Sequence, residues 1–132
     1  MTLMADYTIS KVVAGSHPEV TEAVRAALAQ EGFGVLTEID LAATLKAKVG
    51  AELPPTVILG ACRPQLAHAA IQVEPSIAAV LPCNVVVRQT DAGTCLVEAF
   101  DPDAMMGLAD SAALQDVARD ARTRLAAALA TL

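Results

Sequence analysis

Two cysteines occupy positions where a thiol could do chemistry. Cys62 ends the apolar run "PPTVILGAC", and Arg63 and Pro64 follow it where a helix is expected to begin. The amide N–H groups of a first helical turn carry partial positive charge, which favours a thiolate over a thiol. Cys83, in "LPCNVVV", is likewise at the end of an expected element, since it is the first residue of a strand. This pattern makes Cys62 a candidate nucleophile, redox thiol or soft-metal ligand.

The two cysteine motifs predict one shared site, provided that their strands are neighbours. Cys62, Arg63, Cys83 and Asn84 would then line a common ligand-binding pocket beside the positive end of a helix. His68 lies about one turn into that helix and could serve as a general base for Cys62. A disulfide between the two cysteines would require Cα atoms within roughly 7 Å of each other.

Each of these residues also has a structural explanation. Cys62 can close its strand as a small buried side chain, since free cysteine is among the most buried residue types. His68 stands alone on an alanine-rich helix, with no third residue in the pattern to orient it. Cys95 shares a strand face with Val97 and is assigned to packing. The three cysteines contain no C-x₂₋₄-C pair, so a structural zinc site is not predicted, and metal and cofactor stay unassigned.

The residue pattern also predicts the elements that position these side chains. Alternating β-branched residues indicate strands, apolar residues at helical spacing indicate helices, and Ser16 with Glu19 fits a capping box. Strands are expected at 7–15, 33–39, 54–62 and in a hairpin over 83–100, and helices at 16–34, 41–50, 64–73 and 112–132, with a shorter helical turn from residue 75. The order β-α-β-α-β-α-β-β-α predicts an α+β fold, in which helices pack on a single, mainly antiparallel sheet.

Composition limits the class of protein. The 132 residues are 55% hydrophobic and 18% charged, which predicts one ordered domain over residues 1–132. One Tyr, two Phe and no Trp imply an aliphatic core. We expect no nucleic-acid partner. A net charge of −6 does not attract the phosphate backbone, and the scarcity of aromatic side chains leaves few surfaces on which bases could stack.

The N-terminal stretch, the lengths of the apolar runs and the cysteines indicate in which cellular compartment the protein is expected. The opening "MTLMADYTIS" is not a signal peptide, and no apolar run reaches about 18 residues, so we expect no membrane partner. Three cysteines without the spacing of a disulfide framework predict reduced thiols in the cytoplasm.

Four ordered stretches resemble the domain-of-unknown-function 302 family: "EGFGVLTEIDLAATLKAKVG", "ILGACRPQLAHAAIQVEP", "LPCNVVV" and "EAFDPDAMM". The resemblance extends from Tyr7 to the last expected helix. It implies an α+β fold similar to the TATA-box-binding-protein-like class, with a curved, mainly antiparallel sheet carrying helices, in a small domain that often associates with itself. It implies no reaction. Arg63 departs from the family, which more often carries Asn at this position.

Two functions are therefore predicted as alternatives. In the first, the chain is a cytoplasmic domain that binds a small molecule, a soft metal or a redox ligand in the pocket of Cys62 and Cys83. In the second, it is a non-catalytic interaction domain with structural cysteines, which forms a homodimer through its sheet or its alanine-rich helix. An acid, a base, a nucleophile and an orienting residue cannot all be named, so the sequence leaves enzymatic activity open.

Overall fold

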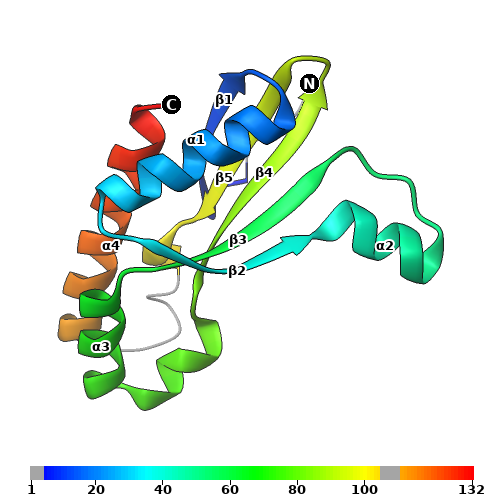
Figure 1. Ribbon diagram of the computed structural model, residues 1–132. Helices are drawn as coiled ribbons and strands as arrows, with labels where there is room; N and C mark the ends of the chain where they lie inside the picture. Colours follow the sequence, from blue (N-terminus) through cyan, green and yellow to red (C-terminus); the bar gives the residue numbers. More distant parts are fainter. Residues whose placement is uncertain (1–4, 105–110) are drawn as a thin grey trace.

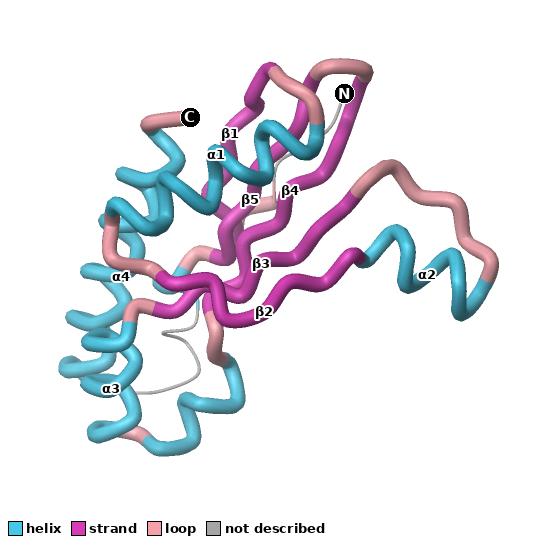
Figure 2. Tube along the Cα trace, viewed as in Figure 1, coloured by secondary structure: helices cyan, strands magenta, loops and turns pink. Residues whose placement is uncertain are grey.

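Five strands form one antiparallel sheet in the computed structural model, which describes residues 5–104 and 111–132 (Figure 1 and Figure 2). In sheet order the strands are β1 (Thr8–Ala14), β5 (Thr94–Phe100), β4 (Cys83–Asp91), β3 (Thr56–Cys62) and β2 (Gly34–Asp40). The helices are α1 (His17–Gln30), α2 (Leu41–Val49), α3 (Pro64–Val73), the 3₁₀ helix η1 (Pro75–Val80) and α4 (Ala112–Ala130). The predicted α+β class, antiparallel sheet and order of elements are confirmed. No helix in these two ranges is long and apolar enough to cross a membrane.

Local residue chemistry sets both ends of α1. Ser16 caps the helix, because its Oγ accepts a hydrogen bond from the amide of Glu19 at 3.3 Å. After the last turn, Gly32 adopts a φ of 85°, in the left-handed region that favours glycine. This turn directs the chain into β2 and brings Phe33 into the core, where it is 4% exposed.

The main core lies between one face of the sheet and the helices α1 and α4 (Figure 1). Alternate residues of the central strands point into it: Val85 and Val87 of β4 are completely buried, whereas Val86 between them is not. Leu28 of α1 and Leu125 of α4 belong to the same cluster. Burial of such side chains drives folding, since each buried Val or Leu contributes roughly 1.5–3 kcal/mol.

A second, smaller apolar cluster joins α3, η1 and α4. Ala70, Ile77 and Leu114 are its buried members, one from each of these elements. Because α3 and η1 connect β3 to β4, the cluster lies at the end of the sheet where β3 finishes and β4 begins (Figure 1). Cys62 and Cys83 are the residues at those two strand ends.

Helix α2 projects from the rest of the molecule at the end of the edge strand β2 (Figure 1). Asp40 caps it, since its Oδ1 accepts a hydrogen bond from the amide of Ala43 at 2.9 Å. None of the residues of α2 is buried. This helix therefore lacks most of the tertiary packing on which helices in proteins usually depend.

Candidate functional site

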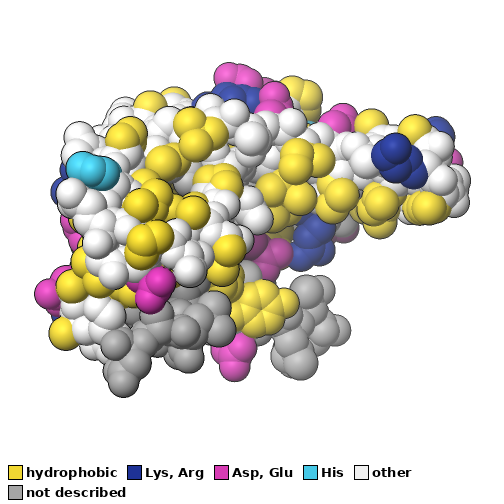
Figure 3. All heavy atoms as spheres, turned by 90° about the horizontal axis from the view of Figure 1, so that it is seen from below, with side chains coloured by type: hydrophobic (Ala, Val, Ile, Leu, Met, Phe, Trp, Pro, Cys, Tyr) yellow, Lys and Arg dark blue, Asp and Glu magenta, His cyan; other side chains and the backbone are white. Residues whose placement is uncertain are grey.

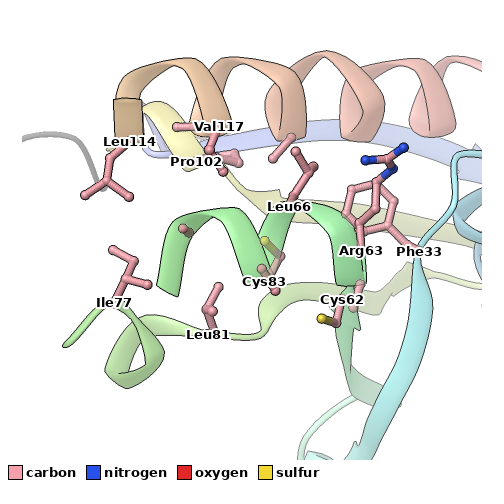
Figure 4. Close-up of a pocket in the computed structure, with 15 residues that line it drawn as sticks. Phe33, Cys62, Arg63, Leu66, Ile77, Leu81, Cys83, Pro102, Leu114 and Val117 are labelled. Carbon is pink, nitrogen blue, oxygen red and sulfur yellow. The ribbon is translucent and has the colours of Figure 1, made fainter. Parts of the chain in front are cut away.

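A cavity of about 50 Å³ opens where the smaller cluster meets the main core (Figure 4). Small side chains leave this space, because alanine stands at positions 67 and 70 of α3 and at positions 118 and 121 of α4. Larger apolar side chains complete the wall, among them Phe33, Leu66, Leu81, Pro102, Leu114 and Val117.

Cys62 and Cys83 line this cavity from neighbouring strands (Figure 4). Ala61 of β3 lies directly opposite Cys83 of β4 in the antiparallel register, and Cys62 follows Ala61. Both thiols are free and partly exposed. The structure therefore brings together the two cysteines that the sequence motifs nominated, because their strands are neighbours.

The surroundings of Cys83 keep its thiol protonated. Burial raises the pKa of Cys83 above its ordinary value of 9.0, and negative charge on Cys62 raises it further. The physical cause is that a thiolate loses its hydration when it is buried and is repelled by a second thiolate nearby. At neutral pH Cys83 is a neutral, polarisable contact, whereas nucleophilic attack and metal binding both require the thiolate.

Arg63 lines one end of the cavity and has no hydrogen-bond or ion-pair partner among residues 5–104 and 111–132. It is the N-cap residue of α3, but its side chain makes no capping hydrogen bond. Its Nε is buried, and no residue of the described ranges accepts a hydrogen bond from it. A buried donor without an acceptor destabilises a fold by about 1–3 kcal/mol. The side chain passes close to Gly32, where an added Cβ would lie 3.0 Å from Nε of Arg63.

The structure does not bring Asn84 or His68 into the cavity, since both side chains are exposed and neither lines the wall. Asn84 lies opposite Gly60 in the register, and it points away from the sheet face that carries Cys83, because successive strand residues alternate between faces. His68 lies on an exposed part of α3. A general-base role for His68 toward Cys62 stays a prediction.

The arrangement gives little support to a metal site. Across residues 5–104 and 111–132, no three His, Cys, Asp or Glu side chains come together in a way that could hold a metal ion. Cys62 and Cys83 provide two sulfur atoms, whereas protein zinc sites use three or four protein ligands.

Sequence reasoning missed the part of the wall that comes from distant segments. Phe33, Pro102 and Val117 line the cavity, although they are far from Cys62 along the chain. The apolar stripe expected in the helix at 112–132 indicates that Val117 faces other apolar groups. Such a stripe does not distinguish a filled core from a cavity. The only signal for the cavity in the sequence is the number of alanines in the two helices that face it.

The chain resembles one family of known sequences and structures. A family model described as "Domain of unknown function DUF302" matches residues 9–132. Among solved structures, the crystal structure of an uncharacterized conserved protein DUF302 from Bacillus stearothermophilus is similar, with 33% sequence identity and a TM-score of 0.87. The match covers 96% of this chain and 98% of the other. No protein with a curated description matches the chain.

Proposed function

The chain belongs to the DUF302 family, whose description gives no function, and we propose a function from the cavity itself. The protein binds a small, mainly apolar molecule between α3 and α4, in contact with the thiols of Cys62 and Cys83. Its role is binding, and the thiols contribute contacts to the bound molecule.

The observation that supports this proposal is the space left by facing alanines on α3 and α4. Protein interiors are close packed, and a cavity destabilises a fold by about 24 cal/mol per Å³. For a cavity of about 50 Å³ this amounts to ~1 kcal/mol. A single water molecule needs only about 10–15 Å³ of such space, so the cavity exceeds the space of one water molecule, and a six-carbon ligand would have to extend out of it or widen it. Its apolar wall favours an occupant that is itself mainly apolar.

The state of Cys83 supports a role in binding more than a role in catalysis for this residue. The raised pKa of Cys83 leaves it protonated at neutral pH, and a protonated thiol is a weak nucleophile. His68, the nearest candidate base in the sequence, is exposed and does not line the cavity. A neutral sulfur atom is polarisable and makes favourable contacts with apolar and aromatic groups.

Shift mapping by nuclear magnetic resonance, with 1-hexanol as the probe, tests this function. We expect the amide signals of cavity residues such as Leu66 and Leu114 to move and saturate as 1-hexanol is added. Ala67→Leu fills the cavity from α3 and should abolish these shifts. Ala69→Leu is the matched control, because Ala69 is also half-buried on α3 but does not line the cavity. Equal shifts in the two variants, or no shifts at cavity residues in the wild type, would contradict the proposal.

The projecting α2 favours self-association as a second candidate function. Leu36 of β2 is 66% exposed and Val49 of α2 is 72% exposed, and Ile39 and Leu53 in the same part of the chain are exposed as well; several such side chains together, unlike a single one, indicate an interaction surface. Figure 3 shows hydrophobic side chains along this projection. β2 is also an edge strand of the sheet, and the outer backbone groups of an edge strand can pair with another chain. A second copy of this chain is the partner we propose.

Light scattering after size-exclusion chromatography tests self-association. The wild type should have twice the 13.6 kDa mass of one chain, and the double variant Leu36→Lys with Val49→Lys should have the mass of one chain. Val12→Lys is the control, because Val12 is 60% exposed on the opposite edge strand β1 and should leave the mass unchanged. A monomeric wild type would remove this candidate, and dissociation by Val12→Lys alone would move the interface to β1.

A further inference from the structure

We infer that the ligand of this cavity carries a carboxylate or phosphate group, which Arg63 binds while the apolar part of the ligand lies between α3 and α4. The inference rests on the proposed function of the cavity and names the class of ligand as a small amphipathic anion. The evidence is the unpaired state of Arg63, the way it is held, and the absence of any other charged side chain in the described wall.

Arg63 differs from every other arginine because it has no acidic partner among the residues that the structure describes. The other arginines form the ion pairs Arg25–Glu38, Arg88–Glu98, Arg119–Asp116, Arg122–Asp101 and Arg124–Asp120. The guanidinium of Arg63 forms no ion pair or hydrogen bond with any residue that the structure describes. The chain is acidic, with a net charge of −6, so carboxylates are plentiful. A guanidinium that pairs with none of the described carboxylates is available to an anion from outside the chain.

The surroundings hold the side chain of Arg63 at the wall of the cavity. Nε is buried, and Gly32 provides the space beside it, since a Cβ on Gly32 would lie 3.0 Å from that atom. Phe33 follows Gly32 and lines the same end of the cavity, where Figure 4 shows it beside Arg63. A long side chain held in this way loses less conformational entropy when it binds a ligand than a free one would.

Arg63 is the only residue with a full charge among the described residues that line the cavity, and it contributes its apolar stem to the wall, because almost none of the lining surface is polar. The other members of the wall are apolar residues and the two cysteines. An apolar wall lowers the local dielectric, which strengthens the attraction between a guanidinium and an anion. The first turn of α3, which begins at Pro64, adds the partial positive charge of a helix N-terminus.

The two ends of the cavity match a molecule with a charged head and an apolar tail. Arg63 and Phe33 lie at one end, and Ile77 and Leu114 lie at the other (Figure 4). A guanidinium can bind two oxygens of one carboxylate or phosphate through parallel N–H bonds, which orients the group. An aliphatic carboxylate or an alkyl phosphate would place its chain among the apolar side chains and its oxygens at the guanidinium of Arg63, beyond the apolar wall.

Calorimetric titration with three probes of equal chain length tests the inference: hexanoate, hexyl phosphate and the neutral hexanamide. The wild type should bind at least one of the anions about tenfold or more tightly than hexanamide, because charge-assisted hydrogen bonds are the stronger ones. The tighter of the two anions identifies the head group. Arg63→Met keeps the length of the stem but removes the charge, and it should lower the affinity for the anions to the affinity of the same variant for hexanamide, which abolishes the preference.

Two further variants separate the possible failures. Arg124→Met makes the same change in net charge at a partly buried arginine that already pairs with Asp120, so it should keep the preference for the anion. Equal affinity of the wild type for anions and hexanamide, or equal losses in the Arg63 and Arg124 variants, would overturn the inference and leave the cavity proposal standing. If no probe binds, or if Ala67→Leu leaves binding intact, the proposed function fails and the inference fails with it.

Discussion

Ala61 of β3 lies directly opposite Cys83 of β4, so the residue after Ala61, Cys62, shares one end of the sheet with Cys83. As a result, the two thiols affect each other, and charge on Cys62 opposes charge on Cys83. The same strand ends form one wall of the cavity, so ionisation of either thiol would place a negative charge in that wall.

The raised pKa of Cys83 predicts a loss of stability at alkaline pH. The unfolded chain releases this proton near the ordinary value of 9.0, whereas the folded chain keeps it to higher pH. Above that value the folded state binds more protons than the unfolded state, so the free energy of unfolding falls with rising pH until the folded thiol also ionises. Urea denaturation at a series of pH values should show a shallower fall for Cys83→Ser than for the wild type.

Two comparisons bear on the cause of that fall. Cys62→Ser removes the neighbouring charge but leaves Cys83 buried. Because burial is the larger cause of the raised pKa, this variant should reduce the loss of unfolding free energy at alkaline pH less than Cys83→Ser does. Some fall should persist in Cys83→Ser, because burial also raises the pKa of Cys95. Parallel pH curves for the wild type and Cys83→Ser would show that Cys83 is not the group responsible.

Gly60 is predicted to tolerate no side chain. A Cβ at this position would lie 2.8 Å from Cγ of Pro82 and would overlap Oγ1 of Thr37. Gly60→Ala should therefore lower the free energy of unfolding by about 1–3 kcal/mol, as overpacking does elsewhere. Gly34→Ala on the neighbouring strand is the control, since the nearest atom to a Cβ there is 4.0 Å away. Chemical denaturation of both variants measures their free energies of unfolding. Similar losses of free energy in the two variants would show that Gly60 has room for a methyl group.

The cap of α2 is expected to stabilise that helix alone. Asp40→Ala removes the hydrogen bond to the amide of Ala43, which is worth about 1 kcal/mol to a helix. Because α2 has no buried residues, its loss should leave the main core folded. Amide hydrogen exchange should become faster in α2 only, with little change in the global free energy of unfolding.

Ser111→Ala is the matched change in α4, where Ser111 accepts a hydrogen bond from the amide of Leu114 at 3.4 Å. Since α4 contributes Leu125 to the main core, this variant should lower the global free energy of unfolding by about 1 kcal/mol. A global loss of the same size in Asp40→Ala would contradict the view that α2 unfolds independently.

Arg63→Met should leave the stability of the ligand-free protein unchanged or raise it by up to about 1 kcal/mol, because a buried donor without an acceptor is removed. Arg122→Met should instead lower the stability by about 0.5–1 kcal/mol, since its Nε lies 3.1 Å from Oδ2 of Asp101. Urea denaturation measures both. A large loss in Arg63→Met would reveal a structural role for this side chain and weaken its assignment to a ligand.

The order of the elements could be predicted from the sequence because each element carries a strong local signal. The cap at Ser16 and the apolar stripe after it place α1, and the β-branched runs place the strands. Boundaries were less accurate: the strand expected at 54–62 begins at Thr56, because Pro54 and Pro55 cannot donate to the sheet. The pairing of β1 with β5 has no local signal at all, since it joins opposite ends of the sequence.

The site could be predicted only in part, for a related reason. Cys62 and Cys83 were found because each stands at a strand end next to a loop, a position that local patterns reveal. The direction of a side chain depends on which sheet face is buried, and this separates Asn84 from Cys83 although they are adjacent. The wall from α4 depends on helix packing between distant segments, so the unpaired state of Arg63 emerged only from the folded structure.

The pairing of the first strand with the last has a consequence for the nascent chain. Thr8 lies opposite Phe100 in the finished sheet. At about 5–20 residues per second, a ribosome would produce β1 roughly 5–18 s before the end of its partner. During that interval β1 has no partner strand, and the apolar side chains of β1 and α1 stay exposed to solvent. We therefore expect chaperones to bind this segment during translation. Ribosome-bound chains stopped before Thr94 should accordingly be cut by proteases far more readily than chains long enough for Phe100 to have left the ribosome exit tunnel.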